Sequence, residues 1–89
     1  MLYIVIERFK DHSAAYQRFQ AQGRMLPEGL QYINSWVEES FDRCFQLMEC
    51  DDPELFKTWT AHWDDLVDFE IVPVMTSAIA AARATSDSD

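Results

Sequence analysis

Four stretches of the chain have the β-branched, aromatic and alternating composition that is typical of β-strands. They span residues 2–9, 30–38, 43–50 and about 67–74. A short polar turn over 39–42 separates the second stretch from the third, so we expect these two to form an antiparallel hairpin. Pro73 indicates that the fourth strand ends at a sheet edge or bulge, because proline cannot donate a ladder hydrogen bond.

The first helix is predicted between the first and second strands. Asp11 can cap a helix that begins near His12, and Gly23 provides the left-handed residue that ends it. Ala15, Tyr16 and Phe19 fall on one face of that helix. A connecting loop over 24–29 follows, since it holds a proline and a glycine.

A second helix is predicted after the third strand, with Asp52 as N-cap and Pro53 at the first helical position. Its apolar stripe repeats at three- and four-residue spacing and consists of Leu55, Phe56, Trp59, Trp63 and Leu66. A short alanine-rich helix, capped by Thr76 or Ser77, is expected to run to about Ala84.

The order strand, helix, strand, strand, helix, strand predicts an α+β fold of ferredoxin-like βαββαβ type with a short C-terminal helix. Eighty-nine residues have room for one domain, which we expect over 1–84, with 85–89 as a frayed tail. In this topology both helices cover one face of an antiparallel sheet, and the other face needs a partner. A domain this short has a thin margin of stability that oligomerisation commonly supplements. We therefore expect a homodimer with facing sheets, a dimeric α/β barrel.

Alternation along the strands divides the sheet residues into two sets on opposite faces. We expect the purely apolar set to lie under the helices: Ile4, Ile6, Ile33, Phe45 and Leu47. The other set mixes aromatic and polar residues, and we expect it on the face away from the helices. Its members are Tyr3, Val5, Glu7, Tyr32, Asn34, Trp36, Gln46, Met48, Glu70 and Val72. A one-residue slip in the strand registers would exchange the two faces.

The mixed face predicts either a filled dimer interface or a cavity that holds a small ligand between the sheets. The candidate pocket residues are Tyr3, Glu7, Arg24, Tyr32, Asn34, Trp36, Gln46 and Met48. Glu7 is the candidate base: buried without a cation it should have a high pKa, whereas pairing with Arg43 would make it structural. Arg24, near the mouth, can pair with an anionic ligand or tie Glu28 or the loop carbonyls.

The charge balance is strongly acidic, with 7 Lys and Arg against 16 Asp and Glu and a formal net charge of −9. Such a surface repels phosphate backbones and anionic membranes, so we expect neither nucleic acid nor membrane as partner. The opening apolar run over 1–6 is too short to span a bilayer and lacks the features of a signal peptide. The expected location is therefore cytoplasmic.

Cysteines and histidines give no sign of a metal or disulfide. Cys44 and Cys50 on one strand would stand roughly 20 Å apart, too far for a disulfide, and are expected as buried thiols. His12 and His62 are expected to be solvated or packed side chains. The acidic residues lack the spacing of a calcium loop, and no His or Cys pair has zinc spacing, so no metal and no cofactor is predicted.

Five segments in a fixed order carry a family resemblance. They are Gly23 to Leu30, Ser35-Trp36-Val37, Cys44 to Glu49, Asp64 to Val67, and Val72-Pro73-Val74. From Met1 to about Ala82 the chain thereby resembles a family of uncharacterised, mostly bacterial proteins, the domain of unknown function 3303. The resemblance implies a member of the dimeric α/β-barrel group and no established activity. That group includes cofactor-independent monooxygenases, haem-degrading enzymes, chlorite dismutase relatives and ligand-sensing modules, but no catalytic residue transfers to this chain.

Three functions are left open by the sequence. The favoured one is a homodimer that binds a small, partly apolar ligand between its sheets. An alternative is a monooxygenase-like or isomerase-like enzyme with Glu7 as base and Asn34, Gln46 or Tyr32 orienting the substrate. The third is a structural or regulatory dimer without ligand.

Overall fold

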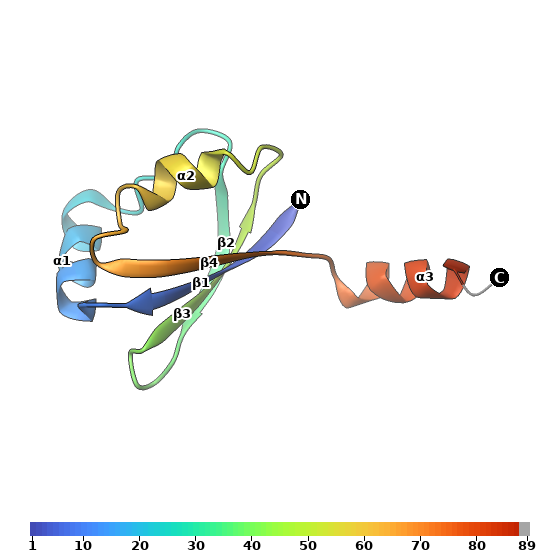
Figure 1. Ribbon diagram of the computed structural model, residues 1–89, viewed down its shortest axis with the longest axis horizontal. Helices are drawn as coiled ribbons and strands as arrows, with labels where there is room; N and C mark the ends of the chain where they lie inside the picture. The colour runs from blue at the N-terminus through green and yellow to red at the C-terminus, as the bar shows by residue number, and fades with distance from the viewer. Residues whose placement is uncertain (88–89) are drawn as a thin grey trace.

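A computed structural model describes residues 1–87 as one four-stranded sheet with three helices (Figure 1). The elements in chain order are β1 (Leu2–Phe9), α1 (His12–Gln22), β2 (Gln31–Val37), β3 (Arg43–Glu49), α2 (Leu55–Thr60), β4 (Val67–Val74) and α3 (Ser77–Asp87). The strands lie in the order β2-β3-β1-β4, and every neighbouring pair is antiparallel. This confirms the α+β, ferredoxin-like fold with a C-terminal helix.

Local signals set the ends of α1 as predicted. The Asp11 carboxylate accepts a hydrogen bond from the backbone N–H of Ala14 at 3.1 Å. Gly23 ends the helix with φ of 68°, and its N–H donates to the carbonyl of Phe19. A side chain at that φ would be strained, which explains why glycine occupies the position.

The second helix is shorter than the sequence predicts. The Asp52 carboxylate accepts from the N–H of Glu54 at 3.0 Å in the turn before the helix, but α2 covers only Leu55–Thr60. Its N-cap is Glu54, which makes no side-chain capping bond, so the prediction of Asp52 as N-cap and Pro53 as first helical residue was wrong. From residue 61 to 66 the chain continues in turns, in which Trp63 N–H bonds to Thr60 and Leu66 N–H to Trp63. Each of these bonds joins residues three apart, as in a 3₁₀-helix, whose turns are tighter than those of an α-helix. The chain can thus enter β4 directly at Val67.

The two faces of β1 and β3 are the reverse of the sequence prediction, whereas Asn34, Trp36, Glu70 and Val72 lie on the face away from the helices, as expected. The buried core against the helices consists of Tyr3, Val5, Leu30, Met48, Cys50, Phe56, Trp59 and Trp63. The ring of Tyr3 on β1 meets that of Phe56 on α2 at 4.9 Å between centroids. Alternation defines which residues share a face, but the right-handed β-α-β crossover determines which side the helices take. The assumption that the purely apolar set faces the helices was therefore wrong.

That apolar set forms the open face of the sheet. Ile4 pairs with Leu47 of β3 and Val72 of β4, and Ile6 pairs with Phe45. These side chains are only half-buried in the single chain, and Trp36 beside Phe45 is 54% exposed. No helix in residues 1–87 covers this face.

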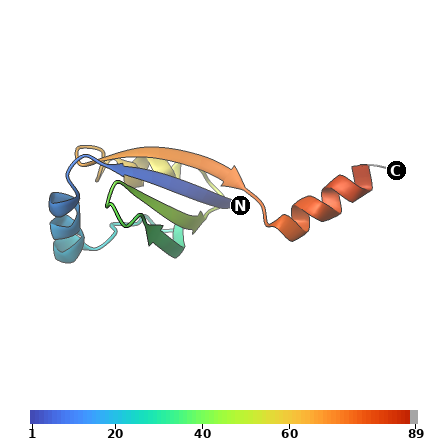
Figure 2. The same cartoon turned by 90° about the horizontal axis from the view of Figure 1, so that it is seen from below.

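The C-terminal helix α3 points away from the sheet in both views (Figures 1 and 2). Thr76 caps it, since its hydroxyl accepts from the N–H of Ile79 at 3.2 Å. The helix runs to Asp87 rather than to about Ala84, and the rest of the predicted tail, 88–89, lies outside the described residues. Within the described chain no helix is long and apolar enough to cross a membrane.

Candidate functional site

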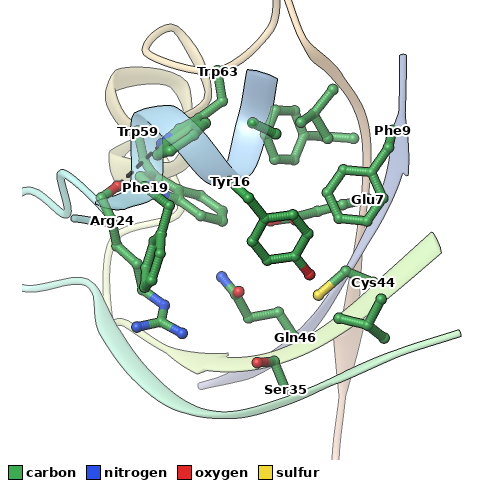
Figure 3. A pocket seen from close by; sticks show the side chains of 14 residues that line it. Glu7, Phe9, Tyr16, Phe19, Arg24, Ser35, Cys44, Gln46, Trp59 and Trp63 are labelled. Atoms are coloured by element: carbon green, nitrogen blue, oxygen red, sulfur yellow. Dashed lines mark hydrogen bonds between the residues drawn. The ribbon is translucent and has the colours of Figure 1, made fainter. Parts of the chain in front are cut away.

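A pocket of about 140 Å³ lies between the sheet and the two helices that cover it (Figure 3). Its floor comes from all four strands, its wall from α1, and its opposite side from α2 and the turns that follow. The lining residues are Glu7, Phe9, Ala15, Tyr16, Phe19, Arg24, Ser35, Val37, Cys44, Gln46, Trp59, Trp63, Val67 and Phe69. The pocket is thus enclosed by one chain and does not lie between two sheets as the sequence suggested.

Glu7 is the acidic group of this pocket. It projects from β1 toward the helices among Phe9, Tyr16 and Cys44 (Figure 3). Burial raises the pKa of its carboxyl from 4.5 to about 7, and the positive charge of Arg24 offsets only part of that rise. Glu7 therefore changes charge near neutral pH.

The alternative partner for Glu7 is engaged elsewhere. Arg43 donates two hydrogen bonds to the carboxylate of Glu38, at 2.6 and 3.0 Å. Arg43 lies opposite Arg8 in the sheet, and neighbouring residues of a strand point to opposite faces. Arg43 therefore belongs to the open face, whereas Glu7 faces the helices. Glu7 is therefore not paired with Arg43, and its role as a base stays a prediction.

Cys44 and Gln46 lie side by side on the pocket floor, on β3. Gln46 is 5% exposed, and its amide contacts the sulfur of Met48 at 3.3 Å. Burial and the nearby Glu7 carboxylate raise the pKa of the Cys44 thiol to about 12, so the group stays neutral. Both cysteines are free and buried, as predicted.

Arg24 reaches the pocket from the loop after α1, and the loop is held by two tryptophans. The indole N–H groups of Trp59 and Trp63 donate to the Arg24 carbonyl at 2.9 and 3.1 Å. The guanidinium lies 3.5 Å from the centroid of the Tyr32 ring and 5.0 Å from that of Phe19. Its position is thus fixed by backbone and aromatic contacts and not by a carboxylate.

Three of the predicted site residues line the pocket: Glu7, Arg24 and Gln46. Tyr3 and Met48 lie in the adjoining core, and Tyr32 supports Arg24 while its hydroxyl bonds to Ser35 at 2.6 Å. Asn34 and Trp36 pair with Leu47 and Phe45 and belong to the open face, away from the pocket. The β-bulge between Tyr32 and Asn34 separates them, because it shifts the alternation of β2 by one residue.

Several pocket residues were not predicted as site residues: Phe9, Tyr16, Phe19, Ser35, Cys44 and Phe69 among them. Two signals in the sequence pointed to part of this set. Tyr16 and Phe19 share a helix face with Ala15, and Cys44 shares a strand face with Gln46, which is two residues further along β3. Ser35 faces the pocket only because of the bulge, for which the sequence gives no local sign.

The histidines and acidic residues contribute no further centre. His12 is exposed and stacks on Phe41 at 5.2 Å between centroids, and the His62 side chain is exposed as well. In the part of the chain that the structure describes, no three His, Cys, Asp or Glu residues lie close enough together to hold a metal ion.

One protein-family model matches nearly the whole chain. Residues 1–86 match the model of the domain of unknown function (DUF3303). The chain is therefore a member of this family. Neither the curated proteins nor the solved structures contain a significant match.

Proposed function

We propose that the protein is a homodimeric binding module that holds one small, partly apolar molecule in the pocket of each chain. The observation that supports this most directly is the composition of the pocket. Aromatic side chains from the sheet, from α1 and from the α2 segment line the pocket. A carboxyl group, an amide and a guanidinium line it as well. Mostly apolar walls with a few convergent polar groups are typical of small-molecule sites.

The dimer part of the proposal rests on the open face of the sheet. Half-buried Ile4, Ile6, Phe45 and Leu47 lie there beside the exposed ring of Trp36. Apolar surface of this kind gains free energy when it is removed from water. Two such faces packed together would make the barrel expected for this fold and would leave each pocket inside its own chain.

Native mass spectrometry on protein purified gently from cells tests the proposal. We expect a dimer that carries a stoichiometric extra mass for each chain. Ala15→Leu, on the pocket side of α1, should abolish the extra mass because the larger side chain occupies the space. Ala21→Leu, on an exposed position of the same helix, is the matched control and should retain it.

Thermal melts must show that both variants fold. A wild-type dimer of bare mass, or an extra mass that persists in folded Ala15→Leu, would contradict the binding site proposed here. A monomer of any mass would contradict the dimer.

A second candidate is an isomerase-like or monooxygenase-like enzyme that uses the same pocket, and Glu7 favours it. A carboxyl group with a pKa of about 7 is protonated and ionised in comparable amounts at neutral pH, which suits a general base. In such a reaction the Glu7 carboxylate would take a proton from a substrate held against Gln46. The residues of the pocket support only this proton transfer step.

The enzyme candidate is tested with the molecule that mass spectrometry identifies. Glu7→Gln keeps the size and hydrogen-bonding capacity of the side chain but cannot accept a proton into a carboxylate. If Glu7 is the base, conversion of that molecule stops while its binding continues. Unchanged conversion by Glu7→Gln would remove Glu7 from catalysis.

A further inference from the structure

The guanidinium of Arg24 lies among aromatic rings, and the carboxyl of Glu7 is across the pocket and not in contact with it. Within residues 1–87 the guanidinium makes no ion pair and no side-chain hydrogen bond. The guanidinium carbon lies over the rings of Tyr32 and Phe19, at 3.5 and 5.0 Å from the ring centroids. Stacking of this kind leaves the N–H groups in the guanidinium plane available, and that plane matches the two oxygens of a carboxylate.

The size of the pocket limits the rest of the ligand. Its volume of about 140 Å³ is close to that of an engineered apolar cavity, about 150 Å³, that binds benzene. The walls are aromatic, with Trp59 and Phe69 in contact at 5.5 Å between ring centroids. One six-membered apolar ring has the size that fills such a space.

The polar side chains opposite Arg24 favour a ligand that has a polar atom on that side. In Figure 3 Glu7 lies across the pocket from Arg24, with Gln46 on the floor between them. A hydroxyl group on the ring can donate to or accept from either side chain. A second anionic group on the ring would instead lie near the Glu7 carboxylate, which disfavours a dicarboxylate.

From these three observations we infer that the ligand class is a single-ring monocarboxylate, with its carboxylate on Arg24 and a ring hydroxyl toward Glu7 and Gln46. The inference rests on the proposed binding function and names its ligand chemistry. The net charge of −9 does not prevent it, because surface charges are screened over about 8 Å at physiological salt whereas Arg24 acts at contact.

The test compares 4-hydroxybenzoate with 4-hydroxybenzyl alcohol, which has the same ring and hydroxyl but no charge. Binding is measured by calorimetry and by NMR shifts of pocket residues, on protein freed of any resident ligand. Three variants are used: Arg24→Gln, Arg24→Lys, and Arg8→Gln as the matched control. Arg8 is exposed and pairs with Arg43 on the open face, so its loss lowers the net charge equally without touching the pocket.

We expect the acid to bind at least about tenfold more tightly than the alcohol, as a charged hydrogen-bonded pair allows. Arg24→Gln should remove that preference and leave the alcohol's affinity unchanged. Arg24→Lys should retain part of the preference, since lysine keeps the charge but not the two parallel donors. Arg8→Gln should retain all of it.

Equal affinity for acid and alcohol, or a preference that survives Arg24→Gln, would overturn the ligand class but leave the binding function standing. Failure of both compounds to shift the pocket resonances would also overturn it. The binding function itself fails if the gently purified wild-type protein has a bare mass, or if folded Ala15→Leu keeps the extra mass. The two failures are therefore distinguishable.

Discussion

At the scale of single residues, the burial of Glu7 links the stability of the fold to pH. Its pKa is raised from 4.5 to about 7, so the folded state holds the proton more tightly than the unfolded state does. The resulting stability is fully present below about pH 4.5 and is lost as the pH rises through 7. The groups that face Glu7 are Arg24 from the loop, Tyr16 from α1 and Cys44 from β3, and the two latter stay neutral over this range.

Glu7→Gln should therefore gain stability over the wild-type protein as the pH rises. We expect the difference in free energy of unfolding to grow by up to about 3 kcal/mol between about pH 4.5 and pH 8, at about 1.4 kcal/mol per pKa unit. Urea denaturation across this range measures it. Glu39→Gln, at the exposed β2–β3 turn, is the control and should show a constant difference. A constant difference for Glu7→Gln as well would contradict the burial of its carboxyl.

The thiols give a second prediction at this scale. Cys44, with a pKa of about 12, and Cys50, whose pKa burial also raises, hold almost no thiolate at about pH 8. We expect neither to react with a disulfide reagent such as DTNB in the folded protein, and both to react once urea unfolds it. Rapid labelling of Cys44 in the folded chain, identified by mass spectrometry of the labelled peptide, would contradict its burial on the pocket floor.

At the scale of elements, the loop that carries Arg24 is held in place by α2 and by the turns that follow it. Trp59 and Trp63 donate their indole N–H groups to one carbonyl of that loop. Trp63→Phe removes one donor and part of a buried ring, so we expect a loss of about 1–3 kcal/mol in the free energy of unfolding. Hydrogen exchange of the amides at 24–28 should also accelerate. Trp36→Phe, on the open face, should leave the exchange of that loop unchanged.

The elements themselves could be predicted because their signals are local. Asp11 and Gly23 delimit α1, Asp52 lies in the turn before α2, and alternating apolar residues mark the strands. The end of α2 could not be predicted, since Trp63 keeps the helical spacing while the backbone already follows tighter turns. Trp59 in α2 and Trp63 in the following turns both donate to the Arg24 carbonyl. Their four-residue spacing looks like that of one continuous helix.

Which residues form the site depends on contacts that are distant in sequence. Glu7, Arg24 and Gln46 were predicted and do meet, although on the helix side of the sheet. Asn34 and Trp36 were separated from them by the bulge in β2. Alternation is a relation within one strand, whereas the side taken by the helices and the placement of a bulge are properties of the assembled sheet.

At the scale of the whole molecule, the open face of the sheet is the feature that a single chain does not explain. Its pairs Ile4–Leu47 and Ile6–Phe45 are apolar, and they are covered by nothing within residues 1–87. A sheet with one solvated face normally alternates apolar and polar residues. Here the open face has an apolar centre around Ile4, Leu47 and Phe45, which favours a second sheet packed on it.

Trp36→Glu tests whether two copies of the chain pair through this face. The ring is 54% exposed in the single chain, so the substitution should cost the monomer fold little. In a dimer it would bury two carboxylates without partners, an arrangement that costs several kcal/mol per charge. We therefore expect sedimentation to give twice the chain mass for the wild type and the single mass for Trp36→Glu. Ile79→Glu, at an exposed site of α3, is the control and should stay dimeric. A wild-type monomer, or a Trp36→Glu dimer, would mean that the sheet faces do not meet.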